Sequence, residues 1–275
     1  KGNDDTDRSE FKILSNIEFS FKIWQSIIDY SKKKFPKMKV LVCVYENGTL
    51  DQVKNLKKVD GYKINSSDLS NNHLLVEIGK TNKLIHLSVG ASTLKEISNA
   101  IKLLRKNSSS KIVLMYGFQS FPTKSSELNM KMLQTLKKKF NLEVGYQDHC
   151  DGDSQQGYLL PAYAIGLGAK VIEKHITHER YKKGLDYESA LNAKDFISFT
   201  NIIRIIEKSS GSGKFENFKR SEINYRKFQK KTIVANKSIK KGNKILIGDL
   251  AFLRAKKLSF QPHEIKKIVN KNAQC

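Results

Sequence analysis

The sequence predicts an α/β protein built as a (β/α)₈ barrel, and three observations favour this fold class. Six short apolar runs alternate with segments of helical periodicity between residues 39 and 209. No Gly-x-Gly-x-x-Gly follows any of the runs, which counts against an open sheet that binds a dinucleotide. Polar residues gather where several runs end, and barrel enzymes place their sites at this end of the strands.

The apolar runs are expected to be parallel strands, because each is followed by a helix-like segment, as in βαβ units. The spacing of Thr93 and Glu96 is that of a capping box and marks one helix start. The expected strands cover residues 39–45, 61–64, 84–89, 111–118, 143–147 and 170–176. The expected helices cover residues 21–34, 50–57, 74–80, 93–106, 128–140, 158–167 and 194–209.

The chain is expected to carry a second, smaller domain. A Ser- and Gly-rich stretch at residues 209–214 is typical of a linker. Beyond it, short apolar runs at 226–235, 238–242 and 245–253 indicate a compact, mainly β module. We therefore assign residues 1–210 to a partial barrel, 211–225 to a linker and 226–275 to the small domain.

The charge is strongly basic, with 50 Lys+Arg against 27 Asp+Glu and a formal net charge of +23. The lysines are scattered in short runs, without a basic helix interleaved with aromatics or a helix-turn-helix pattern, which favours solvated helix faces over a nucleic-acid groove. No apolar run is long enough to cross a bilayer. Three widely separated cysteines indicate a reducing cytoplasm rather than a disulfide framework.

Two histidines follow neighbouring expected strands. Glu173 and His175 share one face of their strand, since side chains alternate. Gln147 and His149 are placed in the same way on the preceding strand. Either histidine alone fits a structural role, but together they match the ligand set of a catalytic divalent metal with open positions.

Other polar residues are expected at the same rim. Lys63 with Ser66, and Ser88 one strand later, form a cradle for a phosphate or carboxylate, although serines at strand ends also simply make turns. A loop at residues 119–123 follows the next strand. Asp186, in the loop after the last strand, is placed to hold sugar hydroxyls or to be a solvated acid.

In this order, the segments resemble the N-acetylneuraminate (sialic acid) synthase family. The family pattern runs Lys-x-x-Ser, Leu-Ser-x-Gly, Tyr-Pro-Thr, Gly-Tyr-Ser-Asp-His and Ile-Glu-Lys-His. This sequence has Lys-Ile-Asn-Ser at 63–66, Leu-Ser-Val-Gly at 87–90, Phe-Pro-Thr at 121–123, Gly-Tyr-Gln-Asp-His at 145–149 and Ile-Glu-Lys-His at 172–175. The Asp-Leu and Arg of residues 249–254 resemble the family's antifreeze-like (SAF) domain.

The resemblance implies a barrel followed by a SAF domain, acting as a cytoplasmic, domain-exchanged homodimer in carbohydrate biosynthesis. The implied reaction condenses phosphoenolpyruvate with an N-acylamino sugar aldehyde to a sialic-type acid and phosphate, with help from a divalent ion, manganese before magnesium or cobalt. Arg254 would reach the barrel of a partner subunit. The implied roles are metal ligation by His149 and His175; catalysis by Glu173 with both histidines; phosphoenolpyruvate binding by Lys63, Ser66, Ser88, Gln119 and Gln147; and sugar binding by Asp68, Phe121, Glu173, Asp186 and Arg254.

The sequence also departs from the family pattern. Gln147 replaces Ser, Phe121 replaces Tyr and Asp68 replaces the commoner Glu, while Ala255 follows Arg254 where the family has Pro. The opening Glu-Ile-Gly-x-Asn-His segment is absent, so we expect an unclosed barrel that is inactive or poorly soluble alone. Two alternatives stay open: a synthase for a legionaminic or pseudaminic acid precursor, and a non-catalytic barrel that binds polyanions.

Overall fold

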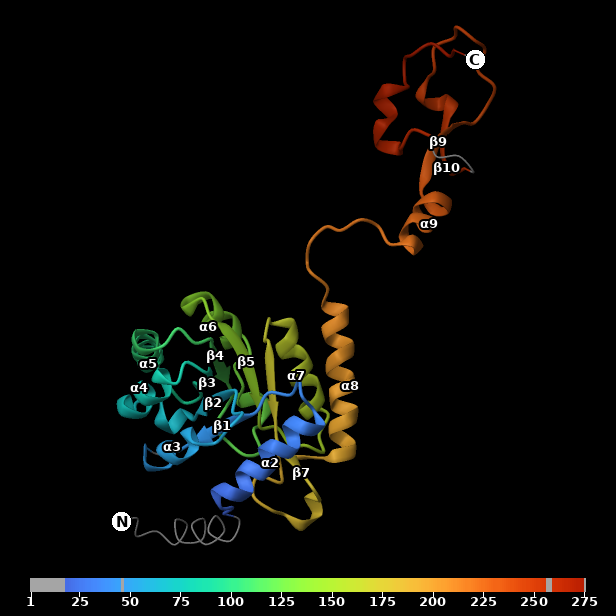
Figure 1. Cartoon of the computed structure of the whole chain (residues 1–275). Coiled ribbons are helices and arrows are strands. Elements are labelled where there is room, and N and C mark those ends of the chain that lie inside the picture. Colours follow the sequence, from blue (N-terminus) through green and yellow to red (C-terminus); the bar gives the residue numbers. More distant parts are fainter. Residues whose placement is uncertain (1–17, 46, 256–258, 275) are drawn as a thin grey trace. The chain divides into compact units, whose positions relative to one another are not determined.

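The computed structural model describes residues 18–45, 47–255 and 259–274. The first seventeen residues of the expected barrel domain lie outside the described residues. The chain separates into two compact units, residues 1–211 and 212–275 (Figure 1). Each unit is described by itself.

The first unit is built on one parallel sheet of six strands in the order β1-β2-β3-β4-β5-β6, so each strand pairs with its neighbour in sequence. This order is that of a barrel wall and confirms the expected parallel α/β architecture. Within the described residues the sheet makes an incomplete barrel whose edge strands are β1 and β6. The strands are β1 (Leu41–Val44), β2 (Gly61–Ile64), β3 (Leu84–Ser88), β4 (Ile112–Tyr116), β5 (Glu143–Asp148) and β6 (Val171–Lys174).

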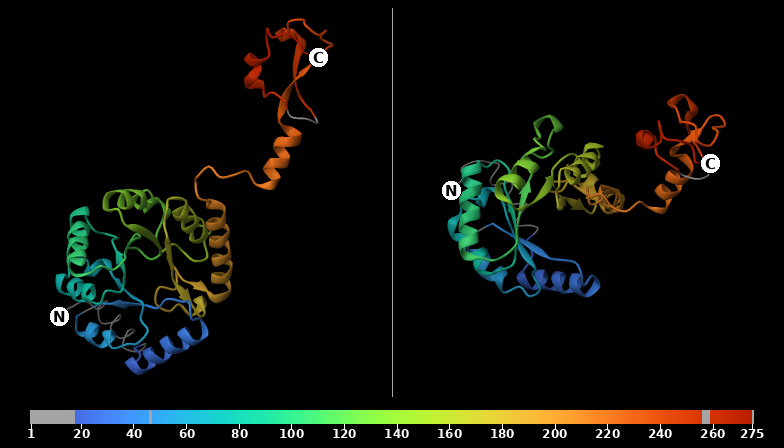
Figure 2. Two further views of the ribbon diagram at one scale, coloured as in Figure 1. Left: turned by 45° about the horizontal axis from the view of Figure 1, so that its top comes forward. Right: turned by 90° about the horizontal axis from the view of Figure 1, so that it is seen from above.

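Helices surround the outside of these strands (Figure 2). Ser20 caps the first described helix by accepting from the backbone N–H of Ile23, and Thr93 with Glu96 forms the expected capping box. The helices are α2 (Phe21–Lys34), α3 (Asn47–Lys54), α4 (Asn72–Lys80), α5 (Leu94–Asn107), α6 (Met132–Phe140), α7 (Gln156–Gly166) and α8 (Ala193–Ser210).

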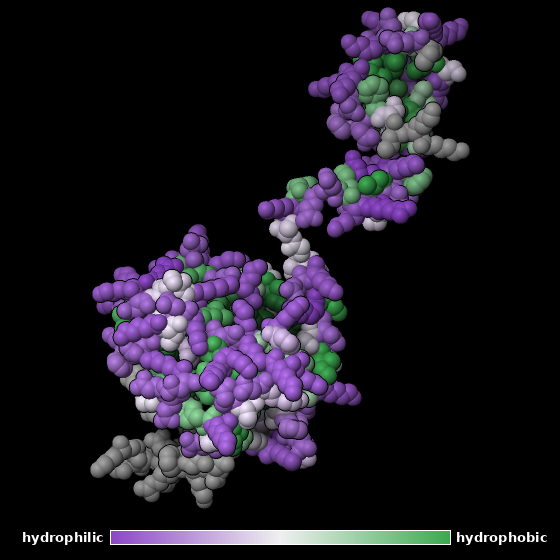
Figure 3. All heavy atoms as spheres, viewed as in Figure 1, coloured by the Kyte–Doolittle hydropathy of each residue, from purple (hydrophilic) through white to green (hydrophobic). Residues whose placement is uncertain are grey.

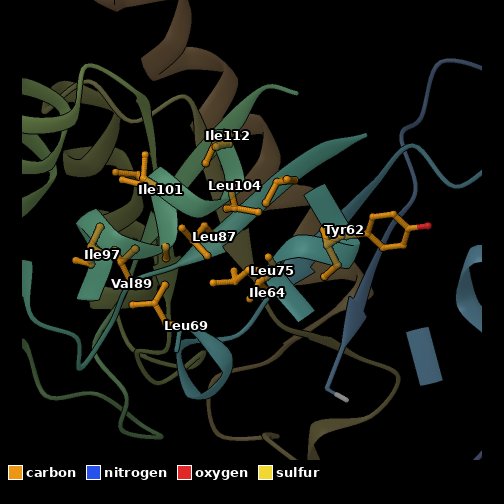
Figure 4. Packing of buried hydrophobic residues seen from close by; sticks show 14 of the residues in the cluster. Tyr62, Ile64, Leu69, Leu75, Leu87, Val89, Ile97, Ile101, Leu104 and Ile112 are labelled. Atoms are coloured by element: carbon orange, nitrogen blue, oxygen red, sulfur yellow. The ribbon is translucent and has the colours of Figure 1, made fainter. Parts of the chain in front are cut away.

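The core lies between the sheet and these helices. Leu87 on β3 packs among Ile97, Ile101 and Leu104 of α5, and all four are buried (Figure 4). The side chains of Ile112 to Met115 on β4 are all buried, as expected for a parallel strand with neighbours on both faces. The apolar interior thus fixes the strands whose ends carry the polar residues.

Several element boundaries differ from the expected ones. The strand expected at 170–176 ends at Lys174, and a separate pair, β7 (Ile176–Thr177) with β8 (Leu191–Asn192), follows it. Helix α6 begins at Met132 rather than at residue 128, and a 3₁₀ turn at Ser125–Glu127 precedes it. Helix α3 is shifted three residues toward the N-terminus relative to the expected 50–57.

The second unit has less β-structure than expected. Helix α9 (Arg220–Gln229) begins inside the expected linker and occupies the start of the expected 226–235 strand. An antiparallel pair, β9 (Lys231–Ala235) and β10 (Leu250–Arg254), forms the sheet of this unit. Among the described residues of 238–249, Lys244 makes only an isolated bridge to Asn272, and Pro262–Lys267 is a 3₁₀ helix.

The visible face of the first unit is mostly hydrophilic, with hydrophobic side chains scattered between (Figure 3). Within the described part of the chain, no helix has both the length and the apolar composition that crossing a bilayer requires.

Candidate active site

A cavity of about 470 Å³ opens where the parallel strands end. Because neighbouring parallel strands run in one direction, the residues that follow them converge on the same rim. The structure brings most of the predicted site residues of the barrel into this cavity. Its lining includes Lys63, Ser66, Ser88, Gln119, Phe121, Gln147, His149, His175 and Asp186, together with Tyr45, Asn65, Ser67, Gly90 and Ala91.

The register of β5 and β6 places the two histidines side by side. Gln147 is the Cα partner of Glu173, and Asp148 is the partner of Lys174. His149 and His175 directly follow the last residues of these two strands, and their ring centroids lie 5.5 Å apart. Since a metal–imidazole bond is about 2.1 Å long, this separation allows both rings to approach one ion.

His149 is held in one tautomer by the backbone. Its Nδ1 lies 2.7 Å from the carbonyl oxygen of Phe118, which only accepts, so Nδ1 carries the proton and Nε2 keeps its lone pair. Burial lowers the pKa of His149, although the Phe118 carbonyl works in the opposite direction. The ring of Phe121 packs against His149 with centroids 4.2 Å apart. His149 is therefore a neutral, oriented imidazole.

His175 has a different environment. Its Nδ1 is buried without a hydrogen-bond partner in the structure. Its Nε2 lies 3.6 Å from Oδ2 of Asp186, beyond hydrogen-bonding distance. Burial lowers the pKa of His175, with Asp186 acting to raise it. A buried nitrogen without a partner is unfavourable, and a group bound in the cavity would supply the missing partner.

A chain of polar side chains crosses the cavity floor from β2 to β6. Lys63 Nζ donates to Glu173 Oε1 at 2.6 Å. Gln147 Nε2 donates to the same oxygen at 3.0 Å, and to Ser88 Oγ at 3.0 Å. Burial alone would raise the pKa of Glu173, but the Lys63 ammonium holds it below its usual value. Glu173 is thus a carboxylate at neutral pH.

The cavity also has features suited to an anion. Lys63 supplies positive charge, and the buried Ser66 Oγ has no partner in the structure. Gly90 permits close packing here, because a Cβ at this position would lie 2.3 Å from the carbonyl oxygen of Gly117. Hydroxyls and an ammonium together form a binding surface for phosphate or carboxylate.

Arg180 fixes the loop that carries Asp186. Its Nε donates to the carbonyl of Tyr187 at 2.9 Å, and Nη2 donates to the carbonyl of Glu188 at 2.9 Å and to Asp151 Oδ1 at 3.0 Å. Arg180 also forms an ion pair with Asp153. The loop after β6 is thereby fastened to the loop after β5, on the side where Asp186 faces His175.

Three predicted residues are not in the lining of this cavity. Glu173 on β6 is one, although it accepts hydrogen bonds from Lys63 and Gln147, which do line the cavity. The other two are Asp68 and Arg254. Asp68 ends the short helix Ser66–Asp68, and it is absent from the cavity lining among the described residues. Arg254 is exposed at the end of β10 in the second unit. The roles of both residues stay predictions.

Two features of the site were missed by the sequence analysis. The first is His86 on β3, and burial lowers its pKa. His86 precedes Ser88 by two residues, and side chains with this spacing share one face of a strand, which was the signal in the sequence. The second feature is an ion pair between Lys174 and Asp148, 2.6 Å long, whose side chains are 1% and 0% exposed. A charged residue beside each histidine, on a strand face that helices cover, was the available signal.

The buried pair lies behind the two histidines. Since side chains alternate along a strand, Asp148 and Lys174 project opposite to the neighbouring His149 and His175. Asp148 also accepts from the Tyr146 hydroxyl at 3.1 Å. A Cβ at Gly157 would lie 3.2 Å from Lys174 Nζ, so the glycine leaves room for the ammonium. The pair joins β5 to β6 immediately behind the cavity.

Cys43 gives a prediction about the interior of the barrel. Burial raises the pKa of its thiol to about 11, so at pH 8.5 we expect roughly a hundredfold less thiolate than in the unfolded chain. Alkylation of Cys43 by iodoacetamide should therefore be slow in the folded chain and should accelerate with pH well above 9. Mass spectrometry of the Cys43 peptide, with and without urea, measures this. Equal rates in both states would contradict the partly buried position of the Cys43 thiol.

The fold and cavity define a class: a parallel βα-barrel protein with a polar site at the carboxyl ends of its strands. The NeuB family model matches residues 1–215. The chain therefore belongs to the NeuB family.

Relatives and solved structures agree with this assignment. The N,N'-diacetyllegionaminic acid synthase of Campylobacter jejuni is 32% identical over 271 residues, covering 97% of this chain and 78% of that protein. The pseudaminic acid synthase of the same species is 29% identical, covering 74% of this chain and 57% of that protein. A crystal structure of N-acetylneuraminic acid (sialic acid) synthetase from Leptospira borgpetersenii, in complex with citrate, matches with a TM-score of 0.71 and 28% identity, covering 80% of this chain and 74% of that one.

Proposed function

We propose that the chain carries the catalytic barrel of a synthase that condenses phosphoenolpyruvate with an N-acylamino sugar aldehyde. The products are a sialic-type nonulosonic acid and inorganic phosphate. The observation that carries the proposal is the meeting of His149 and His175 with Lys63 in one cavity at the strand ends. The relatives, which are named as legionaminic and pseudaminic acid synthases, support the same reaction class.

The two histidines fit a divalent cation. His149 keeps Nε2 free because Nδ1 is bound to a carbonyl, and His175 has a buried nitrogen without a partner. No group of three or more His, Cys, Asp or Glu side chains converges as a ready-made metal site within the described residues. We therefore assign the ion to His149 and His175, with water or substrate oxygens as its other ligands; manganese is the expected metal. When bound, it would supply Lewis-acid polarisation of the aldehyde oxygen.

The chain's own residues account for the rest of the chemistry. Carbon 3 of phosphoenolpyruvate forms a bond to the aldehyde carbon, whose oxygen takes up a proton. Water then adds at carbon 2, and the bond from carbon 2 to the phosphate oxygen breaks. Lys63, Ser66 and Ser88 would position the anion. Glu173 is a carboxylate, so it would first act as an acceptor, either of a proton or of a hydrogen bond from a sugar hydroxyl.

Binding to the purified chain tests this proposal. Calorimetry with Mn²⁺ and phosphoenolpyruvate is expected to show that each ligand binds, and Lys63→Met should weaken phosphoenolpyruvate binding about tenfold or more while Mn²⁺ still binds. A chain that binds neither ligand would contradict the proposal.

The sugar is a separate question. A legionaminic acid precursor is favoured as a second candidate by the relative that aligns with 97% of this chain. Titration of the chain with N-acetylmannosamine and with the aldehyde precursor of N,N'-diacetyllegionaminic acid, followed by ligand-observed NMR, distinguishes the two substrates.

We further propose that the working unit is a domain-exchanged homodimer to which Arg254 contributes. The resemblance of residues 249–254 to the SAF pattern supports this. A monomeric species in analytical ultracentrifugation would contradict it.

A further inference from the structure

The amide of Gln147 forms part of the cavity wall at the end of β5. Its side chain is buried, with the residue 2% exposed, and it lines the cavity. Nε2 donates one hydrogen bond to Ser88 Oγ and one to Glu173 Oε1, each 3.0 Å long. An amide nitrogen has two protons, so both donors of Gln147 are used within the protein.

The orientation of this amide follows from its neighbours. Glu173 is paired with the Lys63 ammonium and is a carboxylate, which only accepts hydrogen bonds. A flipped amide would place Oε1 against that carboxylate, oxygen facing oxygen, with no proton between them. Nε2 therefore faces Glu173, and Oε1 is the free end of the side chain.

Oε1 of Gln147 is buried and has no hydrogen-bond partner in the structure. A buried acceptor without a donor is unfavourable, so a group that enters the cavity and donates to it is stabilised there. The carbonyl-type oxygen can only accept. The complementary ligand atom must therefore carry a proton, as an O–H or an N–H group does.

This requirement separates the two substrates of the proposed reaction. Phosphoenolpyruvate offers a carboxylate and a phosphate, which are acceptors at neutral pH. An N-acylamino sugar offers several hydroxyl groups and an amide N–H. We propose that Gln147 is a specificity-determining residue whose Oε1 accepts a hydrogen bond from an O–H or N–H group of the amino sugar.

The inference rests on the proposed function. It assigns Gln147 to sugar binding, whereas the family resemblance implied a role in phosphoenolpyruvate binding. A serine at this position, as in the family pattern, has a hydroxyl that can donate to a phosphate. Gln147 has no donor left for that purpose. Phosphate binding is then carried by Lys63, Ser66 and Ser88.

Ligand binding to Gln147→Met tests the inference, since methionine keeps the length of the side chain and removes the acceptor. The probes are phosphoenolpyruvate and whichever of the two aldehyde sugars named above binds the wild-type chain more tightly, titrated separately by ligand-observed NMR. Sugar binding should weaken about tenfold, the size of one hydrogen bond between a ligand and a buried acceptor, whereas phosphoenolpyruvate binding should change by less than about twofold.

A ligand series identifies the donor. Monodeoxy analogues of the sugar and an analogue with a methylated amide nitrogen each lack one donor group. For one analogue, the loss of affinity seen with the wild-type chain should vanish with Gln147→Met, because the interaction has already been removed. The other analogues should show additive losses.

Gln147→Ser provides a second variant that introduces no bulk, and thermal unfolding checks that both variants fold. It is expected to weaken sugar binding and to leave phosphoenolpyruvate binding at least as tight as in the wild type. Additive losses for every analogue, with phosphoenolpyruvate still bound, would overturn the inference alone and assign Oε1 to water. A chain that binds neither phosphoenolpyruvate nor either sugar would overturn the proposed function and this inference with it.

Discussion

Replacing Lys174 by Met is expected to lower the free energy of unfolding by about 3–5 kcal/mol, the usual result of removing one partner of a buried ion pair. The side chains of Lys174 and Asp148 are 1% and 0% exposed, and Lys174 Nζ lies 2.6 Å from Asp148 Oδ2. The variant leaves the Asp148 carboxylate in the interior without a cation, with neutral donors such as the Tyr146 hydroxyl and the Cys150 backbone N–H as its partners. Urea unfolding followed by circular dichroism measures the loss.

Two further variants make this result specific. Lys58→Met removes a pair with Asp29 whose side chains are 57% and 47% exposed, and it should cost less than about 1 kcal/mol. Lys174→Met combined with Asp148→Leu removes both charges and should recover most of the stability. If Lys174→Met unfolds at the same urea concentration as the wild type, the pair is not buried as described.

Replacing His175 by Ala is expected to reduce Mn²⁺ affinity by at least about a hundredfold, since one of two proposed protein ligands is lost. His149→Ala should have an effect of the same size. Both rings lie in one cavity with centroids 5.5 Å apart, and burial lowers the pKa of each. Both are therefore neutral at pH 7 and available to bind an ion. Calorimetric titration with Mn²⁺ gives the affinities.

His73 offers a matched control, because it is an exposed histidine on α4. His73→Ala should bind Mn²⁺ as the wild type does. Unchanged affinity in His175→Ala would place the ion elsewhere, and equal losses in all three variants would indicate non-specific binding to histidine.

The order of strands and helices along the chain was predictable, because it depends on the local periodicity of apolar residues. The bounds of α2 and β2 agree with the expected 21–34 and 61–64. Element ends were less predictable, since they depend on partners. Strand β6 stops at Lys174 because β5, with which it pairs, stops at Asp148. The spacing of apolar residues indicates which side chains are buried, but it does not indicate where a helix begins. Met130 is buried, yet it precedes the first residue of α6.

The site was predictable where it follows from adjacent strands. His149 and His175 come together because each follows its strand by one residue in a paired register. The pairing of Lys63 with Glu173 was not predictable, because the two residues are 110 positions apart and meet through the curvature of the sheet. The stacking of Phe121 on His149 likewise depends on the path of a loop.

Pulsed electron paramagnetic resonance of Mn²⁺ bound to chain labelled with ¹⁵N-histidine tests most directly whether two imidazoles share one ion. We expect couplings from two histidine nitrogens to a single ion, and only one coupling after His149→Ala or His175→Ala. A bound Mn²⁺ without any histidine coupling would contradict the assignment of the cavity as the metal-dependent site.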